Sequence, residues 1–386
     1  MKRGETDGLA TEEKRTGRTG RRNRRGDRNC RICRRLPEPR RHDRLDLGGL
    51  DRRHDAGPCV HRSPRTRQMK AMTYHRYGGA EQLRLADLPV PEPGKGQLRL
   101  RVSACAVNLS DWEYLTGAPF YARMVGGYWR PKQPVLGSDV VGIVDKLGPD
   151  TPGFAIGDRV MGDVVMTRGG FAEYVCVPSE LMVKVPEGLS DAVAACLPQA
   201  GGIAVAGTEN VTAGDRLLIN GAGGGSGTMA LQLAKQAGAF VSAVDNGGKV
   251  DWLRALGADE VIDYRAQDFT ETGATWDRIL DMVATRGPRR IAKALAPGGI
   301  YRAVGGEVRV LLSLLLGGAI YRGRHKSIGM LMVPSGRELT ARVAALAKAG
   351  RIAPHLEAEL PLVELPEALA RTGHGEVRGK IVIRPS

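Results

Sequence analysis

The chain has 386 residues, of which 42% are hydrophobic, so it is long enough for two domains and can bury a core in each. This composition excludes a wholly disordered protein. The formal charge of +15 lies mostly in residues 1–68, which hold 21 Lys and Arg against 10 Asp and Glu, whereas the rest holds 36 against 32. Because the body of the chain is close to neutral, we do not expect nucleic acid as a partner.

Residues 1–68 are predicted to be a disordered, Arg-rich tail, because they show neither a strand period nor a helical period. No apolar run follows the basic residues, and acidic residues are too frequent, so neither a secretory signal nor an organelle presequence is indicated. We interpret the segment as a misassigned start, with translation beginning at Met69. A basic arm that touches nucleic acid or anionic surfaces and a small metal knot remain as alternatives. The ligands of such a knot would be Cys30, Cys33, His54, Cys59 and His61.

The segment from Met69 to about residue 193 is predicted to be rich in β-strands. Alternating apolar residues and frequent Gly and Pro turns indicate a barrel-like unit. The clearest strands are expected over residues 98–107, 140–144, 160–161 and 171–177.

Residues 214–305 alternate strands with helices, a pattern that predicts a parallel sheet covered by helices on both faces. Gly238, Gly257 and the turn at 297–299 mark the helix ends. Strands are expected over 216–220, 240–245, 260–264, 278–283 and 300–304, and helices up to about 237, over 250–256 and over 289–295. A helix over 339–349 and a last strand over 379–383 follow, and we expect this strand to rejoin the β-rich unit.

The longest apolar run, residues 308–320, includes Arg309 and is shorter than the ~20 residues that span a bilayer. We therefore expect no membrane span. A buried helix is our interpretation of this run, with a dimer contact or a shallow membrane contact as alternatives. Cys105, Cys176 and Cys196 stand singly in apolar segments, which favours buried thiols and a cytoplasmic location.

The strongest chemical signal is residues 217–228, in which an apolar strand enters a glycine-rich turn that opens a helix. Glycines allow a tight turn and a close approach to a pyrophosphate, and the helix N-terminus offers free N–H groups. Asp245 ends the next strand, where a carboxylate would hold a ribose hydroxyl. No Lys-Ser or Lys-Thr follows, so a P-loop is excluded, and a turn needed only for packing is the alternative. The candidate turn residues are Ala222, Gly223, Gly224, Gly225, Ser226, Gly227 and Thr228.

Several further motifs occur in a fixed order, at residues 69–79, 107–112, 136–142, 157–160, 256–264 and 378–383. With the glycine turn, they resemble the zinc-independent, quinone oxidoreductase-like branch of the medium-chain dehydrogenase/reductase superfamily. The resemblance implies an α/β fold with a GroES-like β-rich catalytic domain over 69–193 and a Rossmann doubly wound parallel-sheet domain over 194–333. Residues 334–386 would return to the catalytic domain. It also implies a homodimer.

The resemblance further implies that no metal is held. Zinc-dependent members of the superfamily carry a Cys ligand where this chain has Asn108 and a His ligand where it has Ser138, and their four-cysteine lobe is missing. Without a Lewis acid, alcohol oxidation is not expected. The expected enzyme is an NAD(P)H-dependent reductase that transfers hydride to a small quinone or α,β-unsaturated carbonyl. A catalytically silent nucleotide-sensing or partner-binding protein is the alternative.

Five catalytic candidates follow from the resemblance. Asn108 would face nicotinamide and substrate, Asp111 would hold its loop, and Ser138 would line the site. Tyr114 and Tyr121 are candidate donors to a carbonyl oxygen, or else pocket walls. We identify no strong general acid.

The cofactor signals conflict. Asp245 would repel a 2′-phosphate and so favours NADH, whereas Lys249 and Tyr264 match positions that hold this phosphate in NADPH-using relatives. We favour NADPH and leave NADH open. Val283 and Gly305 are expected to line the nicotinamide pocket, and Ile203 replaces a family Thr near the carboxamide.

Overall fold

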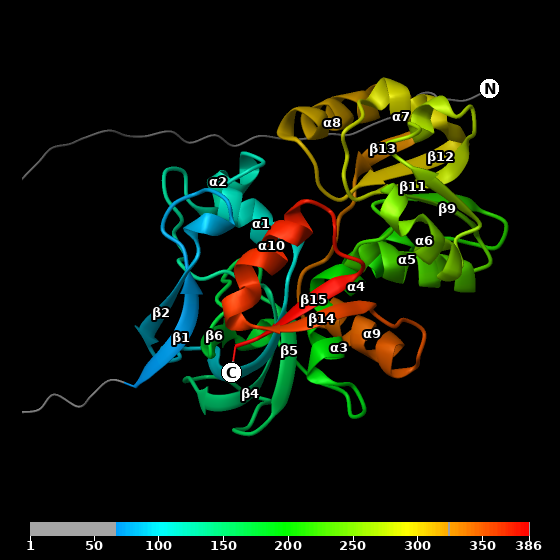
Figure 1. Cartoon of the computed structure of the whole chain (residues 1–386). Helices are drawn as coiled ribbons and strands as arrows, with labels where there is room; N and C mark the ends of the chain where they lie inside the picture. The colour runs from blue at the N-terminus through cyan, green and yellow to red at the C-terminus, as the bar shows by residue number, and fades with distance from the viewer. Residues whose placement is uncertain (1–66, 323–324, 386) are drawn as a thin grey trace, which may run out of the picture. The chain divides into compact units, whose positions relative to one another are not determined.

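The computed structural model describes residues 67–322 and 325–385. The predictions for residues 1–66, including the metal knot and the misassigned start, lie outside this part. Two larger sheets organise the described chain (Figure 1). A separate hairpin is formed by β1 (Gln68–Thr73) and β2 (Arg84–Pro89).

The first larger sheet has seven strands in the order β14-β15-β3-β4-β5-β7, with β6 paired to β3. It is mostly antiparallel. The strand that comes last in the sequence, β15, pairs antiparallel with β3, opposite Cys105 and Ala106. The strands are β3 (Gln97–Ala106), β4 (Asp139–Leu147), β5 (Arg159–Asp163), β6 (Tyr174–Pro178), β7 (Val183–Lys184), β14 (Leu356–Pro361) and β15 (Lys380–Arg384). The C-terminal strand thus lies beside β3, a strand from the N-terminal part of the described chain.

The second sheet has six parallel strands in the order β10-β9-β8-β11-β12-β13. The strand order reverses between β8 and β11, and ligands of such sheets bind outside the carboxyl ends of the strands at this switch point. The strands are β8 (Arg216–Asn220), β9 (Phe240–Asp245), β10 (Glu260–Asp263), β11 (Trp276–Asp281), β12 (Leu295–Ala303) and β13 (Ser327–Met330).

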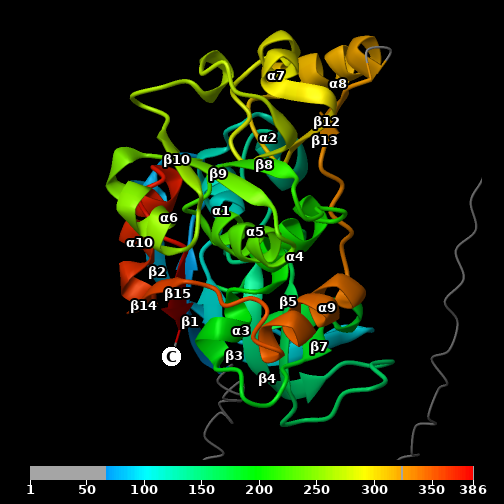
Figure 2. The same cartoon turned by 90° about the vertical axis from the view of Figure 1, so that its right-hand side faces the viewer.

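Helices cover both faces of the parallel sheet, which confirms the predicted α/β fold (Figures 1 and 2). Side chains alternate along β8, so Leu217 and Ile219 pack with α5 while Leu218 packs on the other face. The first face carries α4 (Pro198–Gly207), α5 (Gly225–Gln236) and α6 (Val250–Ala255), and the second carries α7 (Pro288–Ala294) and α8 (Val308–Arg322).

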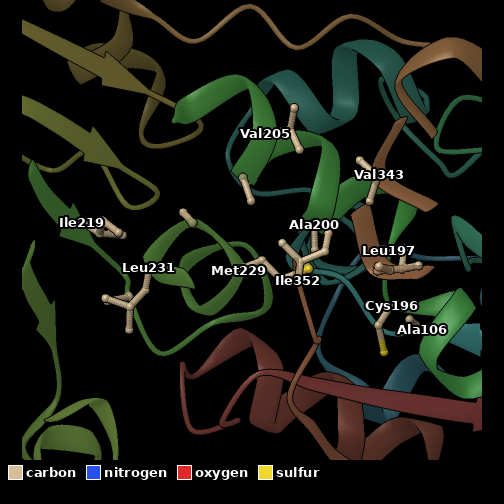
Figure 3. Packing of buried hydrophobic residues seen from close by; sticks show 14 of the residues in the cluster. Ala106, Cys196, Leu197, Ala200, Val205, Ile219, Met229, Leu231, Val343 and Ile352 are labelled. Atoms are coloured by element: carbon tan, nitrogen blue, oxygen red, sulfur yellow. The ribbon is translucent and has the colours of Figure 1, made fainter. Parts of the chain in front are cut away.

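One apolar cluster connects the two sheets. It contains Ala106 of β3 and Ile219 of β8, with Ala200 and Met229 from α4 and α5 between them (Figure 3). The remaining helices are α1 (Leu109–Thr116), α2 (Tyr121–Gly126), α3 (Asp191–Ala195), α9 (Arg337–Lys348) and α10 (Leu365–Gly373).

The structure corrects the expected burial of the apolar run at 308–320. The run is a helix, α8, and Val310 and Leu314 are buried, but Leu316 is 74% exposed and Ile320 67% exposed. Apolar residues occupy more sides of the helix than its neighbours cover. Of the three described cysteines, Cys105 and Cys196 are buried as expected, whereas Cys176 is only half-buried.

Candidate active site

The glycine-rich turn connects β8 to α5 at the carboxyl edge of the parallel sheet. Gly221 has a φ of +86°, which favours glycine. A Cβ on Gly227 would lie 2.4 Å from the Gly221 carbonyl oxygen, so helix and turn touch at the backbone. Gly379, just before β15, donates its N–H to the Gly223 carbonyl at 2.9 Å. The turn is therefore tied to the C-terminal segment as well as to its own helix.

A cavity of about 520 Å³ opens beside this turn. Among the predicted cofactor residues, those on its wall are Gly224, Gly225, Ser226, Gly227, Asp245, Lys249, Tyr264 and Val283. Asn108 and Ile203 also line it. The cavity thus brings the dinucleotide candidates and one catalytic candidate together.

Four predicted cofactor residues do not line the cavity formed by the described residues. Ala222 is buried in the core, and the hydroxyl of buried Thr228 donates to the Gly225 carbonyl. Gly223 does not line the cavity, and its N–H donates to the Asp245 carboxylate. Gly305 follows the lining residue Val304.

Asp245 and Lys249 form a buried ion pair, with 3.3 Å between Nζ and Oδ1. The Asp245 carboxylate also accepts N–H bonds from Gly223 at 2.8 Å and from Asn246 at 2.9 Å. Charge-assisted bonds of this kind fix the carboxylate against the turn. Asp245, which favours NADH, and Lys249, which favours NADPH, are therefore in direct contact.

Asn108 begins α1 and is held by a capping box with Asp111. The Asp111 carboxylate accepts the Asn108 N–H and the Gly137 N–H, each at 3.0 Å, and Asp111 is fully buried. Burial raises the pKa of Asp111 to about 6, against the lowering effect of these two bonds. The predicted loop-holding geometry is therefore present.

The Asn108 carboxamide joins a buried polar network. Its Nδ2 donates to Ser138 Oγ at 3.1 Å, and its Oδ1 accepts from Lys380 Nζ at 2.5 Å. Behind Lys380 lie Asp139 and Asp163, and burial, with the Asp163 carboxyl beside it, raises the pKa of Asp139. Ser138 is fully buried and does not line the cavity that the described residues form.

The two predicted tyrosines do not belong to the cavity wall that the described residues form. The Tyr114 ring lies 4.0 Å from the Arg168 guanidinium carbon. The Tyr121 hydroxyl donates to Glu113 Oε1 at 2.8 Å, and burial raises the pKa of both groups. Their hydrogen-bonding and stacking partners are thus protein groups, and the catalytic role of the two tyrosines stays a prediction.

Two residues near the cavity had no place in the sequence-based site. Lys380 belongs to a segment recognised as a strand and as a family motif, without a role at the site, and Asp281 ends β11. Asp281 accepts bonds from Asn220 Nδ2, from the N–H groups of Val283 and Ala284, and from the Tyr301 hydroxyl. Its position at the carboxyl end of a parallel strand is the signal that could have identified it.

Family models match two parts of the chain. "Alcohol dehydrogenase GroES-like domain" matches residues 94–187, and "Zinc-binding dehydrogenase" matches residues 256–383. A solved quinone oxidoreductase from Coxiella burnetii superimposes with a TM-score of 0.74 at 28% identity, covering 83% of this chain and all of that one. The chain belongs to the medium-chain dehydrogenase/reductase superfamily, in its quinone oxidoreductase-like branch.

Curated relatives of this branch are named as oxidoreductases. A chloroplastic quinone oxidoreductase of Triphysaria versicolor is 29% identical, covering 82% of this chain and 98% of the relative. A 2-methylene-furan-3-one reductase of Solanum lycopersicum is 29% identical, covering 82% and 79%. A 2-haloacrylate reductase of a Burkholderia species is 28% identical, covering 82% and 98%. The superfamily implies an oxidoreductase with an NAD(P) cofactor, and the glycine turn, the open helix N-terminus and the ion pair fit a dinucleotide.

Zinc, which one family description implies, does not fit the residues at this site. An amide at 108 and a hydroxyl at 138 are poor zinc ligands, and the Lys380 ammonium lies 2.5 Å from Asn108 Oδ1, where it would repel a cation. Within residues 67–322 and 325–385, no cluster of three His, Cys, Asp or Glu could hold a metal. In the same ranges, no helix is both long and apolar enough to cross a membrane.

Proposed function

We propose that this protein is an NAD(P)H-dependent reductase that transfers hydride to a quinone or an α,β-unsaturated carbonyl compound. The observation that carries the proposal is one cavity that runs from the glycine turn and the Asp245–Lys249 pair to Asn108. The printed names of the quinone, methylene-furanone and haloacrylate reductases support the same substrate classes. A substrate already electrophilic also suits a site whose residues do not fit a Lewis-acidic metal.

The residues of this chain bind the cofactor, orient the acceptor and stabilise the charge that develops on it. A bound reduced nicotinamide supplies the hydride. The backbone N–H groups at the start of α5 would hold the pyrophosphate, and the Asp245–Lys249 pair would hold the adenosine ribose. Asn108 offers an amide N–H to the acceptor's carbonyl oxygen, on which negative charge develops. Water would then provide the protons, because Asp111 and Asp139 are fully buried and do not line the cavity that the described residues form.

Turnover is the direct test. The purified full-length protein is mixed with NADPH or NADH and with 1,4-benzoquinone, 9,10-phenanthrenequinone or an enal, and nicotinamide oxidation is followed by absorbance. We expect turnover with at least one acceptor. Tight nucleotide binding without turnover would favour the nucleotide-sensing alternative, and failure to bind either nucleotide would overturn the reading of the glycine turn.

We infer that the protein uses NADPH and also accepts NADH. Lys249 brings the positive charge that a 2′-phosphate requires, and Tyr264 lies on the same cavity wall. Asp245, 3.3 Å from Lys249, opposes the phosphate and keeps NADH competitive.

Replacing Asp245 should separate the two nucleotides. In Asp245→Asn, the carboxylate charge beside the phosphate site is lost, and we expect the ratio of kcat/KM for NADPH to that for NADH to rise about tenfold, or ~1.4 kcal/mol. The ratio cancels any general loss from the altered bond to Gly223. Asp251→Asn, a nearby carboxylate whose side chain is 98% exposed, is the control and should leave the ratio unchanged. A ratio that stays constant in Asp245→Asn would show that this carboxylate does not select the nucleotide.

We also infer a homodimer formed through β13 and α8. In the described chain β13 is an end strand of its sheet, and unpaired edges of this kind favour strand pairing. The neighbouring helix exposes an apolar face formed by Leu312, Leu315, Leu316 and Ile320. The three cysteines within the described residues are unpaired, which agrees with the cytoplasmic location that we propose.

Light scattering tests the dimer. We expect the wild type to show twice the 41.4 kDa of one chain, and Leu316→Arg to shift the population to monomer. Val363→Arg is the control. Val363 is apolar and 60% exposed, but it lies just after β14 of the seven-stranded sheet, so this variant should stay dimeric. A monomeric wild type would exclude this interface.

A further inference from the structure

The ammonium group of Lys380 lies inside the protein, between the glycine turn and Asn108. Its residue is only 4% exposed. Nζ donates to Asn108 Oδ1 at 2.5 Å and to the Val107 carbonyl at 2.8 Å. The stem packs on the turn so closely that a Cβ on Gly225 would lie 2.4 Å from Lys380 Cδ. One side chain thus contacts both the nucleotide-binding turn and the catalytic candidate.

Near the Lys380 ammonium lies a second buried polar residue, Asp139. Asp139 Oδ2 lies 4.0 Å from Nζ and has no hydrogen-bond partner in the described chain, while its other oxygen accepts the Gln199 N–H at 3.0 Å. A buried charge persists only when paired or hydrogen-bonded. The Asn108 and Val107 oxygens in front meet this requirement, so the ammonium is held in one place.

We propose that Lys380 is a positioning residue, which fixes the Asn108 carboxamide so that it presents N–H rather than C=O to the reacting carbonyl oxygen. An ammonium only donates, so it selects the amide orientation with Oδ1 toward Lys380 and Nδ2 away from it. One Nδ2 hydrogen then goes to Ser138 Oγ at 3.1 Å. In our proposal the other faces the cavity, which Asn108 and Lys380 both line. This role rests on the proposed reductase function.

The orientation matters because of where charge develops. When hydride adds to an enone or quinone, the electron pair of the carbonyl π bond moves to oxygen, and a proton from water later neutralises the enolate or phenolate. An amide N–H stabilises this oxygen, whereas a flipped amide would direct its own carbonyl dipole against it. Lys380 also polarises the amide through Oδ1, which strengthens the remaining donor.

Three variants test this role in the full-length protein. We expect Lys380→Met to lower kcat with a quinone on the order of 30-fold, with NADPH affinity within about threefold of the wild type. Asn108→Ala should show a similar loss. Because Lys380 acts through Asn108, the double variant should be no more than about twofold slower than Asn108→Ala alone. Losses that multiply in the double variant would overturn the proposal, since they would mean that Lys380 acts independently of Asn108.

Asn108→Asp keeps the test valid if Lys380→Met does not fold. Aspartate retains the bond to Lys380 but has no N–H, so we expect a loss of kcat like that of Asn108→Ala, and wild-type kcat would contradict the proposed orientation. Lys326→Met is the matched control, since Lys326 Nζ likewise donates to two backbone carbonyls, of Ala292 and Leu295, each at 2.7 Å. It should retain kcat within about twofold. A wild type without turnover would instead overturn the reductase function itself.

Discussion

Gly227→Ala should weaken NADPH binding at least about 100-fold, or ~2.7 kcal/mol. The added Cβ would lie 2.4 Å from the Gly221 oxygen and 2.6 Å from both Cα and oxygen of Ala222. All three are backbone atoms, so relief requires the turn to move away from α5. The N–H groups that should hold the pyrophosphate would move with it. Isothermal titration with NADPH measures the loss.

A second glycine separates this effect from a general cost of replacing glycine. Gly287, the N-cap residue of α7, has a φ of −74°, and a Cβ there would meet open space in the described structure. Gly287→Ala should bind NADPH as the wild type does, with a loss of stability of about 1 kcal/mol at most. Wild-type affinity in Gly227→Ala would mean that the nucleotide does not rest on this turn.

The parallel-sheet half of the fold could be predicted well because its signals are local. The strands expected over 216–220 and 240–245 coincide with β8 and β9, where apolar runs end at glycine turns or at an acidic residue. Helix α4, by contrast, was not predicted. It is rich in Ala and Gly and buried along most of its length, so it has no polar face to give a helical period.

The candidate site likewise has a local part that could be predicted and a long-range part that could not. The glycine turn, Asp245 and Lys249 lie within one segment, and the sequence places them together. Lys380 reaches Asn108 across 272 residues, a contact that requires β15 to pair with β3 and that no local pattern contains.

Tyr114 and Tyr121 show that residue type alone does not place a side chain at a site. Their chemistry suits a carbonyl substrate, but residue type does not reveal direction. Glu113 accepts the hydroxyl of Tyr121, and Arg168 covers the ring of Tyr114. A nearby protein group can thus engage a candidate donor before any substrate does.

Asp281→Ala should lower the free energy of unfolding by about 4 kcal/mol, the largest stability change that we expect from one side chain near the cavity. Asp281 is fully buried and accepts four bonds. Oδ1 accepts from Asn220 Nδ2 at 2.7 Å, Val283 N at 3.0 Å and Ala284 N at 2.8 Å, and Oδ2 accepts from the Tyr301 hydroxyl at 2.9 Å. Alanine would leave all four donors without this acceptor, and three of them belong to buried residues, Asn220, Ala284 and Tyr301. Urea denaturation measures the change.

Asp281→Asn should cost less than Asp281→Ala, because its Oδ1 can still accept three bonds while Nδ2 donates to the Tyr301 oxygen, which can accept. Asp277→Ala, on the same strand, removes one bond from the Arg216 N–H at 2.9 Å and should cost less than about 1 kcal/mol. Equal losses in Asp281→Ala and Asp277→Ala would mean that water satisfies the released donors. Because Asn220 and Val283 line the cavity, the destabilised Asp281→Ala should also bind NADPH more weakly, so the carboxylate that joins β8, β11 and β12 also shapes the nucleotide site.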